Sequence, residues 1–152
     1  MRIAFVCHGN ICRSPMAEFV FKNMIKDKLT DVFVLSRATS DEEIWAGVGN
    51  PIHRGTLEIF KKYNIPFDRE KRAVQLKKSD YADFDLFIGM DNANITNMRR
   101  LFDGDPQNKV KRLLDYTPKG GEVADPWYTG DFEATYEDVC LGCTYLLAEI
   151  TK

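Results

Sequence analysis

The stretch RIAFVCHGNICRSPMAEFVF, residues 2–21, contains the features that decide the fold. Its apolar start, RIAFVC (2–7), predicts a buried strand. The segment PMAEFVFKNMIKD (15–27) predicts the following helix, with Ser14 at the N-cap and Pro15 at the first helical position. A short polar loop with two cysteines and an arginine joins them. This loop is either a structural turn or a site of chemistry.

The rest of the chain repeats the alternation of strand and helix. Further strands are predicted at 31–38, 85–90 and 109–114, and further helices at 50–64, 91–102 and 132–150. Such alternation is typical of a parallel sheet with helices on both faces. We therefore expect one α/β domain, residues 1–152, with a four-stranded, mostly parallel sheet. Ligands of such sheets bind beyond the carboxyl ends of the strands, where loop 8–14 lies.

Composition excludes several classes of protein. The 152 residues are 44% hydrophobic and 29% charged, with a formal net charge of −2. Nucleic-acid and membrane-surface binders normally carry a basic excess, so neither partner is expected. The first residues lack the apolar region of a signal peptide, and no window is apolar enough to span a membrane. We expect a cytoplasmic protein.

The four cysteines do not suggest a disulfide framework, because cytosolic thiols stay reduced. With only His8 and His53 available, a zinc site of ordinary spacing is hard to assemble, so no metal is expected. Cys140 and Cys143 form a C-x-x-C pair inside the last predicted helix. Cys143 lies on the helix's apolar face, so packing is favoured over a redox or metal role.

The loop itself has the parts of a phosphate site. The spacing Cys7-x5-Arg13 allows the backbone N–H groups of the loop to surround one anion at the N-terminus of a helix. That positive field favours the thiolate form of Cys7, and Arg13 offers a planar fork for two phosphate oxygens. Gly9 allows close approach of the backbone, and Asn10 tolerates a left-handed conformation. The parts fit phosphoryl transfer through a phosphocysteine; the alternative is a chance C-x5-R pattern at a strand end.

A leaving oxygen needs an acid, and the loop VADPWYTGD (123–131) is the best place for one. Asp125 is followed there by Pro126, which stiffens the loop, and by Trp127 and Tyr128, which can flank a flat aromatic group. The alternative is a surface turn, because Asp-Pro is a common turn dipeptide. The first loop, 8–14, lacks the G-K-[ST] of a nucleotide-binding loop, and no cofactor is expected.

The segment VCHGNICRSPMAE (6–18) resembles the phosphate-binding loop of the low-molecular-weight protein tyrosine phosphatases, whose motif is V-C-x-G-N-x-C-R-S-P. The match continues in family order through SRATS (36–40), GNPIHRG (49–55), FDLFIGMD (84–91) and ADPWY (124–128). It therefore covers essentially the whole chain.

The resemblance implies a role for each loop residue. Cys7 is similar to the family's nucleophile, Arg13 to its phosphate clamp and Asp125 to its general acid and base. Ser14 corresponds to the hydroxyl that stabilises the thiolate, and Cys12 to a cysteine that can form a reversible disulfide with the nucleophile. The resemblance places the following residues around the substrate phosphate or in support of it: His8, Gly9, Asn10, Ile11, Cys12, Ser14 and the supporting Ser36.

Substrate class also follows from the resemblance. Members that act on phosphoarginine carry threonine where this chain has Ile11, so phosphotyrosine proteins are the expected partners. Trp127 and Tyr128 are expected to form one wall of the site. Trp45, in a segment whose glycines suggest a mobile loop, is expected to form the opposite wall. The sequence predicts no oligomeric state.

Two other functions remain open at this point. An arsenate reductase of the same fold needs a relay of further cysteines, and none occurs between Cys12 and Cys140. A phosphate-binding module without activity needs neither a nucleophile nor an acid, whereas this chain has both Cys7 and Asp125.

Overall fold

Four parallel strands form the central sheet of the computed structural model, which describes residues 1–152. The strands are β1 (Arg2–Cys7), β2 (Phe33–Ala38), β5 (Leu86–Gly89) and β6 (Val110–Arg112), in the order β2-β1-β5-β6. β1 is central, pairing with β2 and β5. Because all four strands are parallel, their carboxyl ends lie at one edge of the sheet. The predicted fold class is confirmed.

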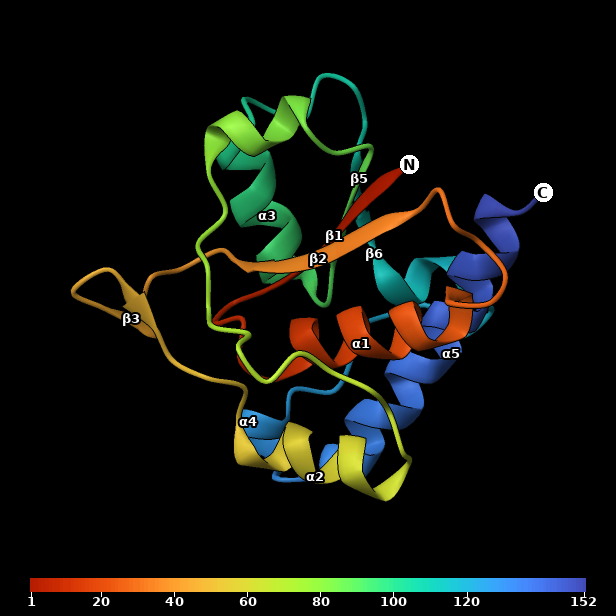
Figure 1. Cartoon of the computed structure of the whole chain (residues 1–152). Helices are drawn as coiled ribbons and strands as arrows, with labels where there is room; N and C mark the ends of the chain where they lie inside the picture. Colours follow the sequence, from red (N-terminus) through yellow and green to blue (C-terminus); the bar gives the residue numbers. More distant parts are fainter.

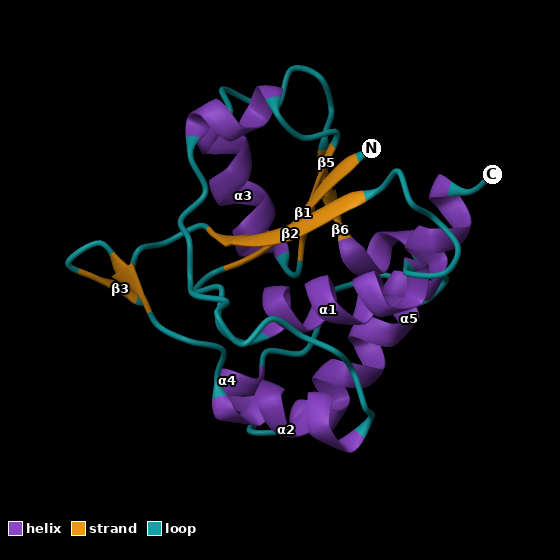
Figure 2. Cartoon of the chain, in the orientation of Figure 1, coloured by secondary structure: helices purple, strands orange, loops and turns teal.

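Helices cover both faces of this sheet (Figures 1 and 2). One face carries α1 (Arg13–Ile25) and α5 (Phe132–Ile150), with α2 (Arg54–Lys62) packed against both helices. The other carries α3 (Asn92–Leu101) and the 3₁₀ helix η1 (Lys78–Ala82). Shorter helices are η2 (Leu113–Tyr116) and α4 (Pro126–Thr129). No helix is both long and apolar enough to cross a membrane.

The side chains of β1 alternate between two cores. Ile3, Phe5 and Cys7 belong to the larger cluster, with α1 and α5, whereas Ala4 and Val6 belong to the smaller one, beneath α3. This alternation is the period of two that a strand imposes. It explains why residues 3–7 are apolar throughout, and it points the last side chain, Cys7, toward the α1 face.

The last helix packs as its sequence pattern predicts. Val139, Cys143 and Leu146 are fully buried in the larger core. Complete burial raises the pKa of the Cys143 thiol well above its ordinary value, so this thiol stays protonated. Its partner in the C-x-x-C pair, Cys140, is half-buried on the same helix. The packing interpretation therefore fits this pair.

The helix predicted at 50–64 exists, but it is shorter than predicted and runs from Arg54 to Lys62. The helix predicted at 50–64 begins only at Arg54, because the backbone of Asn50 pairs elsewhere: its N–H donates to Glu43 O at 2.8 Å and its carbonyl accepts from Ala73 N at 2.9 Å. His53 is the N-cap, and its Nδ1 accepts from Gly55 N at 3.0 Å.

The segment around Trp45, expected to be a loop, contains a β-hairpin. β3 (Ile44–Trp45) and β4 (Val48–Gly49) pair antiparallel and project from the body of the protein (Figure 1). The two residues between them, Ala46 and Gly47, both have positive φ, of 51° and 80°. Two such residues are typical of the tight turns that connect hairpins.

Candidate active site

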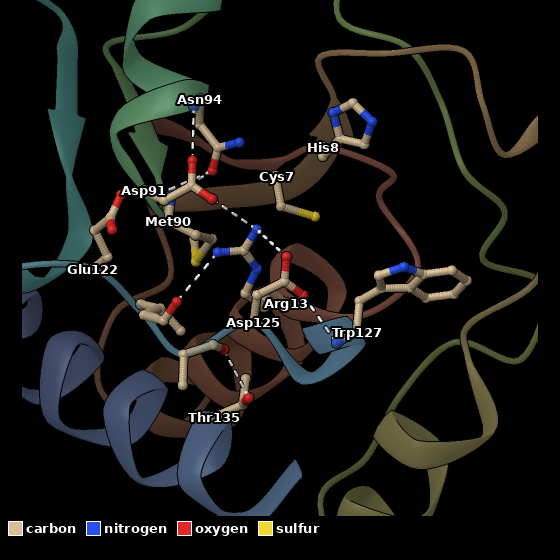
Figure 3. Close-up of polar contacts among 12 residues, drawn as sticks. Cys7, His8, Arg13, Met90, Asp91, Asn94, Glu122, Asp125, Trp127 and Thr135 are labelled. Atoms are coloured by element: carbon tan, nitrogen blue, oxygen red, sulfur yellow. Dashed lines mark hydrogen bonds and ion pairs between the residues drawn. The ribbon is translucent and has the colours of Figure 1, made fainter. Parts of the chain in front are cut away.

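A cavity of about 430 Å³ opens at the carboxyl end of β1. The loop between β1 and α1 forms its floor, and loops that follow β2, β5 and η2 form its walls. Its lining residues are Cys7, His8, Gly9, Asn10, Ile11, Cys12, Arg13, Glu42, Glu43, Asp91, Ala93, Asn94, Asp125, Trp127 and Tyr128. The structure thus brings the two sequence segments singled out for chemistry, 7–14 and 123–128, to one place (Figure 3).

The Cys7 thiol is buried and lies at the centre of hydrogen-bond donors, with 4% of the residue exposed. The backbone N–H groups of Asn10 and Ser14 donate to its Sγ at 3.3 Å and 3.4 Å, and Ser14 Oγ lies 3.0 Å away. Donors that converge on one sulfur stabilise a negative charge there. The loop therefore surrounds the Cys7 sulfur with hydrogen-bonding groups.

Asn10 holds the loop in its turn. Its φ of 61° is left-handed, as the residue type predicts. Nδ2 donates to Ser14 Oγ at 2.8 Å and to Ser36 Oγ at 3.0 Å. Oδ1 accepts from Lys71 Nζ and Val74 N, both at 3.0 Å. Every hydrogen-bonding position of this buried amide is used, which fixes the conformation of the loop around Cys7.

Ser14 does not cap the helix as expected. α1 begins two residues earlier than predicted, at Arg13, and its N-cap is Cys12, whose carbonyl accepts from Met16 N at 3.2 Å. The Ser14 hydroxyl lies instead between Asn10 and Cys7. A capping serine and a serine that faces a thiolate have the same sequence context, so the pattern alone could not separate them.

Arg13 lies between two carboxylates (Figure 3). Its Nη2 donates to Asp91 Oδ2 at 2.9 Å and to Asp125 Oδ2 at 3.3 Å, and Nη1 donates to Val123 O at 3.2 Å. Burial by itself would lower the pKa of this guanidinium, but the negative charges of Cys7, Asp125 and Asp91 raise it above its ordinary value. Arg13 is therefore a fixed cation beside the Cys7 sulfur.

Asp125 is the N-cap of α4. Its Oδ1 accepts from Trp127 N at 3.0 Å, and Pro126 takes the first helical position. The cap orients one carboxylate oxygen and leaves the other, Oδ2, toward Arg13. Trp127 and Tyr128, 70% and 85% exposed, stand at the rim of the cavity.

The remaining predicted residues do not all line the cavity. His8 lies at the rim, where its Nε2 is 2.9 Å from Glu42 Oε2. Ile11 and Cys12 line the cavity. Trp45, 85% exposed on the β3–β4 hairpin, does not line it. Its role as the opposite wall stays a prediction.

Sequence reasoning missed two residues that hold the site. Asp91 binds Arg13 and also caps α3, accepting from Asn94 N at 2.8 Å. Its position directly after β5 was a usable signal, because the carboxyl ends of parallel strands share one edge. Lys71 comes from a segment with no regular secondary structure, and no local pattern marks such a residue.

The second cysteine of the loop, Cys12, has a shifted pKa. Burial raises the pKa of the Cys12 thiol to about 12, and the negative charges of Cys7 and Asp125 add to the shift. Cys12 is therefore a protonated thiol at neutral pH.

No three His, Cys, Asp or Glu side chains lie close enough together to hold a metal ion.

Comparisons with known proteins match one family over nearly the whole chain. A family model described as low molecular weight phosphotyrosine protein phosphatase matches residues 2–152. The chain is 40% identical to the low molecular weight protein-tyrosine-phosphatase YfkJ of Bacillus subtilis, covering 99% of this chain and 96% of that protein. It is 38% identical to the corresponding phosphatase PtpA of Staphylococcus aureus, covering 99% and 94%. The crystal structure of SP-PTP from Streptococcus pyogenes, a low molecular weight protein tyrosine phosphatase, matches with a TM-score of 0.87 and 41% identity, covering 99% and 93%.

Proposed function

This chain belongs to the low molecular weight phosphotyrosine protein phosphatase family and is a cysteine-dependent phosphatase, and from that premise we propose that it hydrolyses phosphotyrosine monoesters through a phosphocysteine. The observation that carries the mechanism is the Cys7 sulfur, which receives two backbone N–H groups at the floor of the cavity with Arg13 in the same loop. We propose that residues 1–152 act as one phosphatase domain.

In the first step the Cys7 thiolate attacks phosphorus. A P–S bond forms, the P–O bond to the tyrosine breaks, and its electron pair leaves with the phenolic oxygen. The loop N–H groups and the Arg13 guanidinium bind the equatorial oxygens, where charge is spread in the transition state. Asp125, protonated, gives its proton to the leaving oxygen. Arg13 Nη2 donates to Asp125 Oδ2 at 3.3 Å, and this contact opens when the phosphate of the substrate takes that donor.

In the second step water replaces the sulfur. The carboxylate of Asp125 takes a proton from the water as the water oxygen attacks phosphorus, and the P–S bond breaks to return the Cys7 thiolate. In the structure the Cys7 thiol donates to Ser14 Oγ at 3.0 Å; once the sulfur is a thiolate, the Ser14 hydroxyl donates to it. Inorganic phosphate is released.

The rim of the cavity suits a phenyl ring. Trp127 and Tyr128 are exposed aromatic side chains beside the phosphate site, and aromatic pairs add stabilisation beyond their buried area. Ile11 adds an apolar surface. We propose that Trp45 reaches the substrate from the hairpin, on the side opposite Trp127.

We expect phosphotyrosine peptides to be hydrolysed at least about 10-fold faster, in kcat/KM, than phosphoarginine peptides of the same sequence. An isoleucine at position 11 offers no hydrogen bond to a guanidinium, and a buried polar group without a partner is costly. Release of inorganic phosphate from both peptides measures the ratio. A preference for phosphoarginine would contradict the assignment of substrate while leaving the loop chemistry intact.

We further propose that Cys12 protects the nucleophile. When peroxide oxidises Cys7 to the sulfenic acid, the Cys12 sulfur can attack it, forming an S–S bond and releasing water. A thiol reductant then restores both cysteines. Because Cys12 is protonated at neutral pH, this step is slow until a base removes its proton.

We propose a cytoplasmic location, where thiols are kept reduced.

The redox proposal predicts a difference in recovery. After brief treatment with hydrogen peroxide, wild type is expected to regain most of its own initial activity with dithiothreitol. The Cys12→Ser variant is expected to regain less than about a third of its own, because its sulfenic acid proceeds to irreversible acids. Activity before and after reduction, with mass spectrometry of the loop peptide, measures both. Equal recovery by the two proteins would disprove the role of Cys12.

A further inference from the structure

Two side chains of α5 hold the residue that precedes Asp125. Asp138 Oδ2 accepts from Ala124 N at 3.0 Å. Thr135 Oγ1 donates to Ala124 O at 2.8 Å (Figure 3). Thr135 and Asp138 are three residues apart, so they lie on one face of the helix and bind both backbone groups of Ala124. Neither lines the cavity, so they can affect the reaction only through the loop that they hold.

Both side chains are buried, and their polar atoms have partners. Thr135 is 0% and Asp138 is 7% exposed. The second oxygen of Asp138, Oδ1, accepts from Lys119 Nζ at 2.5 Å, so the carboxylate is also paired with a cation. Leaving a buried polar group unpaired is costly, so such groups keep their hydrogen bonds. The contacts of Ala124 with α5 are therefore well fixed.

The residue before Ala124 is held from other directions. Val123 N donates to Met90 O at 2.9 Å, and Val123 O accepts from Arg13 Nη1 at 3.2 Å. All four backbone polar groups of residues 123–124 therefore have partners, which come from the end of β5, the start of α1 and α5. The segment cannot shift along the edge of the sheet without breaking several of these hydrogen bonds.

The contacts with α5 matter most when substrate is bound. The contact of Asp125 with Arg13, at 3.3 Å, is expected to open when a phosphate binds. The cap contact with Trp127 N, at 3.0 Å, lies within the same loop and moves with it. The contacts of Ala124 with α5 lie outside the cavity and remain, so they tie this loop to a helix of the core.

We propose that Thr135 and Asp138 are positioning residues for the acid: by binding both backbone groups of Ala124 they hold the Asp125 carboxyl within reach of the leaving oxygen. The inference rests on the proposed role of Asp125 as general acid. A proton is transferred only across hydrogen-bond distance. Because a misplacement of about 1 Å can cost about 100-fold in rate, loss of one of these contacts is expected to slow the step that needs the acid.

Four variants test the proposal. Thr135→Val removes the hydroxyl and nearly keeps the size of the side chain, whereas Thr135→Ser keeps the hydroxyl. Asp138→Ala removes the other contact with Ala124. The matched control is Thr144→Val, the same change at an exposed threonine of α5 whose hydroxyl donates to Cys140 O at 2.7 Å. This control also covers the weaker contact of Thr135 Oγ1 with the carbonyl four residues before it, at 3.4 Å.

With a phosphotyrosine peptide, we expect Thr135→Val to lower the rate constant of tyrosine release in the first turnover by about 10- to 100-fold. With p-nitrophenyl phosphate, whose leaving group needs no proton, the same step is expected to fall by less than about threefold. Thr135→Ser and Thr144→Val are expected to stay within about threefold of wild type with both substrates. Rapid mixing measures these rate constants. Tungstate affinity, from calorimetry, is expected to stay within about twofold of wild type, since the phosphate loop is unaltered.

A second comparison separates positioning of the acid from support of the fold. In an Asp125→Asn background, which supplies no proton, Thr135→Val is expected to cost less than about twofold in the same rate constant, because effects that act through one residue are not additive. A threonine that only stabilises the fold would cost the same factor in both backgrounds.

Thr135→Val equal to Thr144→Val in the first turnover of the phosphotyrosine peptide would overturn the inference, as would an equal loss in the wild-type and Asp125→Asn backgrounds. Should Thr135→Val fail to fold, Asp138→Ala is held to the same two comparisons. Failure of the acid assignment is a separate result, namely Asp125→Asn that releases tyrosine as fast as wild type.

Discussion

Cys7→Ser is expected to lower kcat by at least about 10⁴-fold while tungstate still binds. A serine hydroxyl at neutral pH is neutral and is a far weaker nucleophile than a thiolate. The anion site is expected to survive the change, because a serine oxygen can accept from Asn10 N and Ser14 N as Cys7 Sγ does, and the contact of Arg13 with Val123 O is untouched. Calorimetry with tungstate and release of phosphate from a phosphotyrosine peptide measure the two properties on one sample.

Cys140→Ser is the matched control for this experiment. It makes the same chemical change at a half-buried cysteine of α5, outside the cavity. It is expected to keep kcat within about twofold of wild type. A Cys7→Ser protein that retains turnover would contradict the nucleophile assignment. One that loses both turnover and tungstate binding would mean that the sulfur also organises the loop.

The position of the loop could be predicted because each part of its signal is local. The apolar run of β1, the turn residues and the helix that follows are all contained in residues 2–21. A parallel sheet then places this loop at the carboxyl edge, whatever the details of the other strands. The same rule brings Asp125 near Cys7 only if the last loop folds back over that edge. The structure shows that it does, since Val123 N donates to Met90 O at 2.9 Å, next to β5.

The contacts that hold the loop were beyond local patterns. Lys71 and Asn10 are 61 residues apart, and the segment that carries Lys71 has no regular secondary structure. The predicted start of the helix at 50–64 was wrong for a related reason. Asn50 and Pro51 are a good helix start in isolation, but Asn50 pairs with Glu43 and Ala73, and these tertiary hydrogen bonds outweigh the local preference. Sequence reasoning therefore located the reacting groups better than the residues that support them.

Asp125→Asn is expected to lower kcat for phosphotyrosine by about 10²- to 10⁴-fold, the usual worth of a positioned acid and base. Asparagine cannot supply a proton to the leaving oxygen. Its side-chain oxygen can still accept from Trp127 N, as Asp125 Oδ1 does at 3.0 Å, so the cap of α4 is preserved. Steady-state release of phosphate from a phosphotyrosine peptide measures the loss.

The leaving group distinguishes an acid from a residue that only shapes the loop. p-Nitrophenolate is stable enough to leave without a proton, so the first step with p-nitrophenyl phosphate is expected to suffer less from Asp125→Asn than the first step with phosphotyrosine. The burst of phenol in rapid-mixing experiments isolates that step from hydrolysis of the phosphocysteine. Asp131→Asn is the control, because Asp131 caps α5 by accepting from Ala134 N at 3.0 Å and lies outside the cavity. Equal slowing of both substrates would contradict proton donation by Asp125, since only a change in the shape of the site affects good and poor leaving groups alike.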